Sequence, residues 1–173
     1  MEISGRALRL AAWCAAALGT ASVHPPAHAE STMCPQPQRA VFSCPVGAKQ
    51  VAVCASDPLT EATGTLQYRF GRPAKVEMAY PPKTADWRAL TRGGTLMFSG
   101  GGGAFIAFEK RPYRYVVYSA VGQGWGSKAG VVVERSGKRV ANLSCTAEAS
   151  SELGPALFSA AGIKPFEDSF ELP

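Results

Sequence analysis

The chain has 173 residues, 46% of them hydrophobic, and a formal net charge of +5, which is enough length and apolar content for one globular domain. It contains two histidines, His24 and His28, and both lie near the N-terminus. If that segment is removed, no histidine remains, and Ser-His-Asp sites, Cys-His sites and the commonest transition-metal ligand are excluded.

The N-terminal segment is typical of a secretory signal peptide. Arg6 and Arg9 precede an apolar run over residues 10–23, and small residues at 27–29 resemble a cleavage site. The apolar run is shorter than the roughly 18–20 residues of a membrane-spanning helix. We therefore predict a signal peptide over residues 1–29, no membrane span, and a mature protein that is periplasmic or secreted.

Four cysteines remain after the predicted cleavage site: Cys34, Cys44, Cys54 and Cys145. An even number in an exported chain indicates two disulfides, and four cysteines allow three pairings. Cys44 and Cys54 end two strand-like runs joined by a turn at 45–48, so we expect them to pair across a hairpin. Cys34 would then pair with Cys145. No CxxC spacing occurs, which argues against a redox-active or zinc-binding pair.

Short runs rich in Val, Phe and Tyr, separated by Gly and Pro, continue to residue 145 and indicate an all-β domain. In residues 65–70, Leu66, Tyr68 and Phe70 alternate with polar residues, as in a half-buried strand. The other runs are 39–44, 49–54, 75–80, 95–98, 104–108, 113–121, 130–135 and 139–145. The pattern predicts a small antiparallel barrel or sandwich of about eight strands, and we favour the barrel because closure removes sheet edges.

Three segments interrupt the strand pattern. Residues 81–88 lack alternation and predict a loop or a single helical turn. The glycine-rich segments 93–94 and 100–103 lack the Lys and Ser/Thr of a P-loop, so we expect flexible hairpin connections, with a backbone anion nest as the alternative. Residues 147–173 predict an acidic tail or a short helix after a β domain at 30–146.

Charge is uneven along the predicted mature chain. Residues 30–146 contain fifteen Lys and Arg and seven Asp and Glu, a net charge of +8, whereas residues 147–173 contain one Lys and five acidic residues, a net charge of −4. The general interpretation is a solvated surface that keeps the protein soluble. A sharper one is that the body attracts anionic envelope material, or that the tail folds back over the basic face.

The loop 122–128 is the strongest candidate for binding. Trp125 lies among glycines, where it is difficult to bury, and an exposed Trp beside Lys128 is a common recognition unit for sugars, peptides and protein surfaces. The alternative is that Trp125 folds inward as a barrel plug. Ser127 and Lys128 are adjacent, so in a strand their side chains point to opposite faces, and a Ser-x-x-Lys spacing is absent.

A second candidate segment mixes cations with aromatic residues at strand spacing: Arg111, Tyr113, Arg114 and Tyr115. Such residues can stack on nucleobases or glycans. Because the predicted periplasmic location argues against nucleic acid, we expect ordinary strand residues here, with Arg114 facing water.

Carboxylates would have to supply any acid-base catalysis in a chain without histidine, since a glycoside hydrolase needs only two of them. The candidates are Asp57, Glu61, Glu77, Asp86, Glu109 and Glu134. Glu109 and Glu134 fall late in predicted strands, but we favour their interpretation as solvent-facing side chains next to cations.

Several runs resemble those of a group of small exported bacterial proteins to which no function is assigned: 41–44, 49–54, 68–71, 113–118, 130–133 and the closing Cys145. This resemblance implies an exported, disulfide-bearing β domain. The layout is also similar, more loosely, to periplasmic inhibitors of c-type lysozyme, small β-barrels in which a loop Ser and a Lys enter the lysozyme cleft. Ser127 and Lys128 are the positions that correspond, although here they are adjacent and the basic body would repel a basic lysozyme.

Together these features predict a non-enzymatic binding or inhibitor module of the bacterial envelope. Its partner would be a glycan or a protein, with no nucleic acid, cofactor or metal, and its binding residues would be Trp125, Ser127, Lys128, Tyr113 and Arg114. The alternatives are a carboxylate-dependent hydrolase of cell-wall glycan, and a structural or accessory envelope protein in which Trp125 is buried.

Overall fold

The computed structural model describes residues 33–173 together with Met1. The predicted signal peptide and its cleavage site lie outside the described residues. No helix in the described part of the chain is long and apolar enough to cross a membrane.

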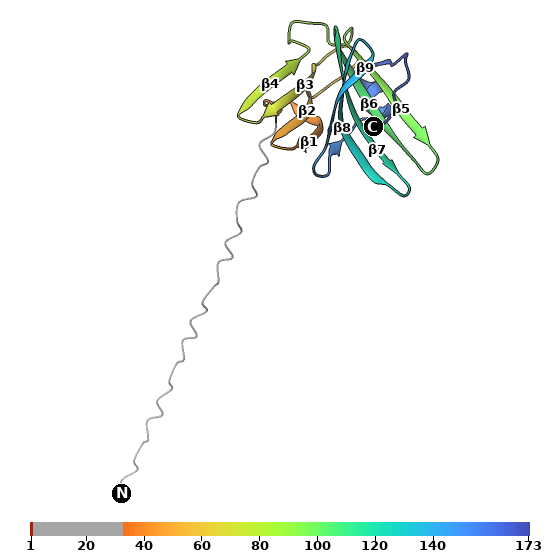
Figure 1. The fold of residues 1–173 in the computed structure, drawn as a ribbon. Helices are drawn as coiled ribbons and strands as arrows, with labels where there is room; N and C mark the ends of the chain where they lie inside the picture. Colours follow the sequence, from red (N-terminus) through yellow and green to blue (C-terminus); the bar gives the residue numbers. More distant parts are fainter. Residues whose placement is uncertain (2–32) are drawn as a thin grey trace. The chain divides into compact units, whose positions relative to one another are not determined.

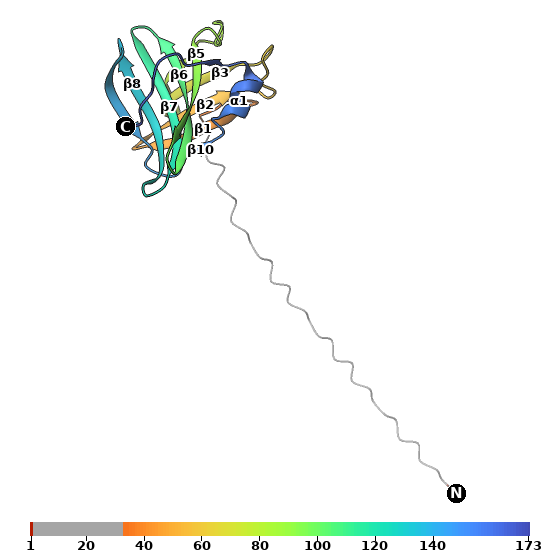
Figure 2. The same cartoon turned by 90° about the vertical axis from the view of Figure 1, so that its right-hand side faces the viewer.

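The first sheet is antiparallel and has the strand order β10-β1-β2-β3-β4; Figure 1 labels β1 to β4, and Figure 2 labels β10. Its strands are β1 (Arg39–Val46), β2 (Lys49–Ala55), β3 (Leu66–Arg72), β4 (Lys75–Tyr80) and β10 (Ser150–Ser151). The loop 81–90 that leaves this sheet forms turns, as the lack of alternation predicted. Trp87 fixes this loop, because its indole is buried and Nε1 donates to the Gly64 carbonyl at 2.9 Å.

The second sheet has the strand order β11-β5-β6-β7-β8-β9. Its strands are β5 (Thr91–Phe98), β6 (Gly101–Lys110), β7 (Tyr113–Gly122), β8 (Gly126–Arg135), β9 (Lys138–Ser144) and β11 (Lys164–Pro165). All neighbours are antiparallel except β11 and β5, which are parallel. In Figure 1 the turns of the β5–β6 and β7–β8 hairpins lie at the lower right, away from strands β1 to β4 of the first sheet.

The main core lies between the two sheets. Alternate residues of facing strands enter it, and the Tyr68 ring of β3 lies 5.8 Å from Phe108 of β6 and 5.4 Å from Tyr115 of β7. The helix α1 (Pro155–Ala161) contributes Phe158 and Ala161 to the same core. The predicted all-β class is therefore confirmed.

The two sheets are not closed into a barrel, so the preference for a barrel over a sandwich was wrong. No strand pairing between the sheets occurs in residues 33–173. Closure is unnecessary at the β5 side of the second sheet, because α1 packs there and β11 pairs with β5. Covering an edge with another segment removes the same liability as closing the sheet.

The predicted disulfide pairing was also wrong: Cys34 pairs with Cys54, and Cys44 pairs with Cys145. In the β1–β2 hairpin Cys44 is opposite Val51 near the turn, whereas Cys54 is opposite Ala40 at the far end. The two cysteines also lie on opposite faces of the sheet, since Cys44 belongs to the main core and Cys54 to a small cluster with Cys34. The Cys44–Cys145 bridge therefore connects the two sheets.

The glycine-rich segments are strand interiors and not only flexible connections. Gly94 lies within β5 directly beneath the Phe105 ring, where a Cβ would be 2.4 Å from the ring. Gly93 faces Phe158 and Ile163, and its Cβ would be 3.1–3.2 Å from them. These glycines are required because a neighbouring side chain occupies the space of their own.

The acidic C-terminal segment folds back onto the body, as one of the sequence interpretations proposed. Residues 166–173, hereafter the strap, cross the outer face of the second sheet (Figure 2). Phe166 and Phe170 pack on Phe105 with ring centroids 5.2 and 4.8 Å apart. The outer face of this sheet is thus an additional small core beneath the strap.

Candidate functional site

The predicted binding residues lie at opposite ends of β7 and β8. Trp125, Ser127 and Lys128 are at the β7–β8 turn, whereas Tyr113 and Arg114 begin β7. Tyr113 is eight residues from Val121, a separation of about 27 Å along an antiparallel strand. The structure therefore does not combine them into one site, and each end of the sheet is a separate candidate.

At the β7–β8 turn, the aromatic rings of Trp125 and Phe98 form a pair, and the Trp125 ring packs on Gly122. The indole lies against Gly122, where a Cβ would be 2.2 Å from the ring. The centroids of the Trp125 and Phe98 rings are 5.5 Å apart. The ammonium group of Lys128 is 5.3 Å from the indole centroid. Trp125 is nevertheless 39% exposed, so it does not plug the interior.

The opposite face of the same hairpin ends is also apolar and exposed. Met97 and Val121 are 91% and 58% exposed. The strand register places them in one row with Ser127, because Met97 is opposite Gly102, Gly102 is opposite Val121, and Val121 is opposite Ser127. We refer to the ends of these hairpins as the hairpin-tip surface, which has Phe98, Trp125 and Lys128 on one face and Met97 and Val121 on the other.

Ser127 and Lys128 point to opposite faces of β8, as predicted from their adjacency. Ser127 is opposite Val121, whereas Lys128 is opposite Ala120. Lys128 Nζ donates to the Pro173 carbonyl oxygen at 3.0 Å, so this cation also contacts the end of the strap. The two side chains cannot reach one reacting atom from the same face, which argues against a Ser-Lys pair.

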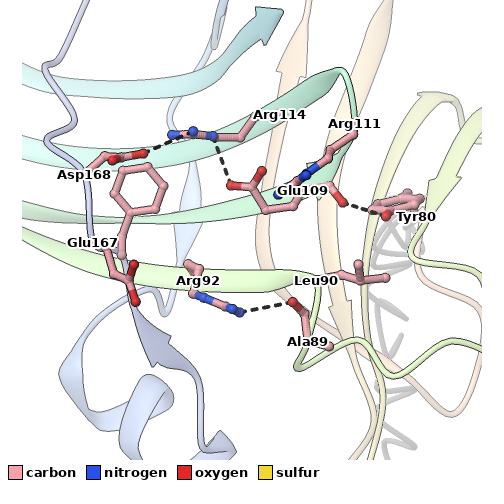
Figure 3. Close-up of a pocket in the computed structure, with 10 residues that line it drawn as sticks. Tyr80, Ala89, Leu90, Arg92, Glu109, Arg111, Arg114, Glu167 and Asp168 are labelled. Atoms are coloured by element: carbon pink, nitrogen blue, oxygen red, sulfur yellow. Dashed lines mark hydrogen bonds and ion pairs between the residues drawn. The ribbon is translucent and has the colours of Figure 1, made fainter. Parts of the chain in front are cut away.

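The prediction that Arg114 faces water was wrong. Its side chain is only 21% exposed and lies among three carboxylates. Nε is 3.0 Å from Glu109 Oε1, and Nη1 is 3.5 Å from Glu134 Oε2. Nη2 donates to Asp168 Oδ2 at 3.2 Å, and the guanidinium lies 4.8 Å from the Phe166 ring (Figure 3). This network attaches the strap to β6, β7 and β8.

The same network bears on the hydrolase alternative. Glu109 and Glu134 are two of the six carboxylates considered for acid-base catalysis, and both form ion pairs with the guanidinium of Arg114. Because one guanidinium engages both carboxylates, the geometry of this pair gives the hydrolase hypothesis no support.

A pocket of about 540 Å³ lies beside this network, between the end of the second sheet, Tyr80 and the strap (Figure 3). We refer to it as the arginine pocket, because Arg92, Arg111 and Arg114 line it. The Tyr80 hydroxyl donates to the Glu109 carbonyl oxygen at 2.6 Å. Burial, reinforced by Glu109, raises the pKa of Tyr80, so the hydroxyl remains a donor at neutral pH.

A second depression of about 650 Å³ adjoins the arginine pocket. It shares Glu109, Arg111 and Arg114 and extends to Tyr113 and the β8–β9 turn. Sequence reasoning identified Tyr113 and Arg114 but missed the contribution of Arg92 and Phe166, which come from distant segments. No short-range pattern relates these positions, and only the paired strands and the strap bring them together.

No protein-family model matches this chain, and comparison with curated proteins and with solved structures found no match. The residues and their geometry are therefore the basis for any functional proposal.

Proposed function

We propose that the mature protein is an exported, non-enzymatic binding module of the bacterial envelope that recognises a glycan or a protein through the hairpin-tip surface. One observation carries this proposal: Trp125 is fixed against Gly122 and Phe98 while 39% of it stays exposed. A rigid, partly exposed aromatic side chain loses little conformational entropy on binding. Aromatic residues of this kind are the usual anchors of recognition surfaces.

The neighbouring side chains support the same function. Met97 and Val121 expose apolar surface at the ends of two adjacent hairpins, where neither sheet packing nor the strap covers them. Exposed apolar side chains at the tips of adjacent hairpins are typical of interaction surfaces. Lys128 adds the cation beside Trp125.

The compartment is part of the proposal. Two disulfides are compatible with a periplasmic or extracellular protein, because such bonds persist in oxidising compartments. Expression of the full chain, followed by fractionation and N-terminal sequencing, tests this point. Cleavage after residue 29 and recovery outside the cytoplasm are the expected result.

The binding site is tested by affinity capture from an envelope extract supplemented with peptidoglycan fragments and lysozyme. The test variant is Trp125→Ala/Lys128→Ala. The matched control, Val140→Ala/Lys138→Ala, also removes one exposed apolar side chain and one lysine, but from β9. Bound species are identified by mass spectrometry, and circular dichroism verifies that both variants fold.

The expected result is a ligand that the wild type and the control retain and that the test variant loses. Loss of an aromatic anchor weakens affinity by about 2 kcal/mol or more, which is roughly thirtyfold. Equal capture by the test variant would refute the assignment of the hairpin-tip surface. Retention of no specific species by the wild type would refute the binding function under these conditions and favour a structural role.

A further inference from the structure

The three guanidinium groups that line the arginine pocket differ in how their charge is balanced. Arg114 contacts three carboxylates. Arg92 and Arg111 have no carboxylate within ion-pair distance among the described residues, although both line the same pocket. The lining holds three arginines and three carboxylates, and two of those arginines, Arg92 and Arg111, form no ion pair within the described chain.

Arg92 is held in place by neutral groups. Its Nη1 donates to the carbonyl oxygens of Arg88, Ala89 and Thr91 at 3.1, 3.2 and 2.8 Å, and Figure 3 shows the bond to Ala89. These bonds fix the guanidinium without cancelling its charge. Its Nε and Nη2 have no hydrogen-bond partner within residues 33–173, so a positioned cation keeps donors available for a ligand.

Arg111 approaches the pocket from the β6–β7 turn. Its side chain extends beside Glu109, across the pocket from Arg92 (Figure 3). The Glu109 carboxylate forms an ion pair with Arg114 at 3.0 Å. Glu167 is exposed and is the one carboxylate in the lining that has no ion-pair partner in the described chain, so the lining groups without such a partner are two guanidiniums and one carboxylate.

The remaining walls favour an organic body over a bare ion. The rings of Tyr80 and Phe166 line the pocket, and Phe166 is fixed between Arg114 and Phe105. The volume of about 540 Å³ falls within the range of about 300–1,000 Å³ that is typical of small-ligand sites. Aromatic walls with a few fixed polar groups are common in sites that hold a sugar ring.

We propose that the arginine pocket is a second binding site, separate from the hairpin-tip surface, for a sugar-sized ligand that carries a carboxylate or phosphate group. Arg92 and Arg111 bind the oxyanion, and Tyr80 and Phe166 contact the ring. Guanidinium groups match both anions through paired N–H donors. The proposal does not depend on the hairpin-tip surface, which lies at the other end of β7.

The test is isothermal titration of the mature protein with glucuronate, glucose 6-phosphate and glucose at low ionic strength. The three probes share a ring and differ in the anionic group, so they separate a carboxylate site from a phosphate site. The test variant is Arg92→Gln/Arg111→Gln. The matched control is Arg72→Gln/Lys75→Gln, which removes two exposed cations from the β3–β4 turn.

At least one anionic probe is expected to bind, and glucose to bind at least tenfold more weakly. The test variant should weaken binding of the anionic probe at least tenfold, while the control leaves it within twofold. Glu167→Gln should strengthen it severalfold, because that change removes the unbalanced carboxylate of the pocket. Absence of binding by both anionic probes, equal binding of glucose, or equal losses in test and control variants would overturn the proposal.

Discussion

The Cys44–Cys145 bridge should stabilise the protein more than the Cys34–Cys54 bridge. The two bridges span 101 and 20 residues. In the chain-entropy treatment, loops of these lengths correspond to about 4.7 and about 3.3 kcal/mol at 25 °C, a difference of about 1.4 kcal/mol. Cys44 also lies in the main core and its bridge connects the two sheets, so removal of that pair should additionally loosen sheet packing.

The assay is equilibrium unfolding in urea of two double variants, Cys44→Ala/Cys145→Ala and Cys34→Ala/Cys54→Ala, monitored by circular dichroism. The first variant should lose more free energy of unfolding than the second. Peptide mapping of the unreduced wild type provides an independent measurement of the pairing. A larger loss in the second variant would refute the entropic argument, and a peptide that joins Cys44 to Cys54 would refute the pairing.

Three further predictions concern packing and pH. Gly94→Ala places a methyl group against the Phe105 ring and should cost about 1–3 kcal/mol of unfolding free energy, whereas Gly154→Ala, which meets open space, should cost less in the same urea titration. Burial raises the pKa of Tyr68, so the unfolded chain releases this proton first as pH rises. Stability should therefore fall above about pH 10 by up to about 1.4 kcal/mol per pH unit, and a Tyr68→Phe variant should show a shallower fall in alkaline melts. Phe170→Ala removes a ring that packs beneath the strap and should increase the rate of limited proteolysis within residues 166–173; an unchanged rate would contradict that role.

The strands were predictable because side-chain alternation is a local property. The run at residues 75–80 coincides with β4, and that at 113–121 agrees with β7 to within one residue. β5 begins at Thr91, four residues before the predicted strand. The prediction started late because Gly93 and Gly94 were interpreted as a flexible hairpin connection. A glycine that makes room for a ring from another strand cannot be distinguished from a turn glycine without that partner.

The pairing of the cysteines was not predictable from spacing alone. Two cysteines on the two strands of a hairpin can form a disulfide only if they lie opposite each other and on the same face of the sheet. Cys44 is opposite Val51, and Cys54 is opposite Ala40 on the other face. The partner of Cys44 follows β9 and depends on how the two sheets pack, which local sequence does not encode.

The two candidate sites also differ in how far local sequence predicts them. Exposure of Trp125 was one of two predicted outcomes, because adjacent glycines supply no side chains to cover it. The arginine pocket was not predicted, since its walls come from the end of β4, the start of β5, the β6–β7 turn and the strap. Arg114 was noted among candidate residues, but the carboxylates that surround it come from three other segments.

The charge asymmetry between body and tail has an internal explanation on the outer face of the second sheet. Arg114 contacts Asp168, Arg139 donates to the Glu171 carbonyl oxygen at 2.8 Å, and Lys128 donates to the Pro173 carbonyl oxygen at 3.0 Å. The strap thus pairs one carboxylate with Arg114, whereas its two carbonyl contacts hold Arg139 and Lys128 in place without cancelling their charge. Arg92 and Arg111 line the arginine pocket and have no acidic partner in the described chain. A net charge of the body therefore says less about anion binding than the positions of these two guanidinium groups.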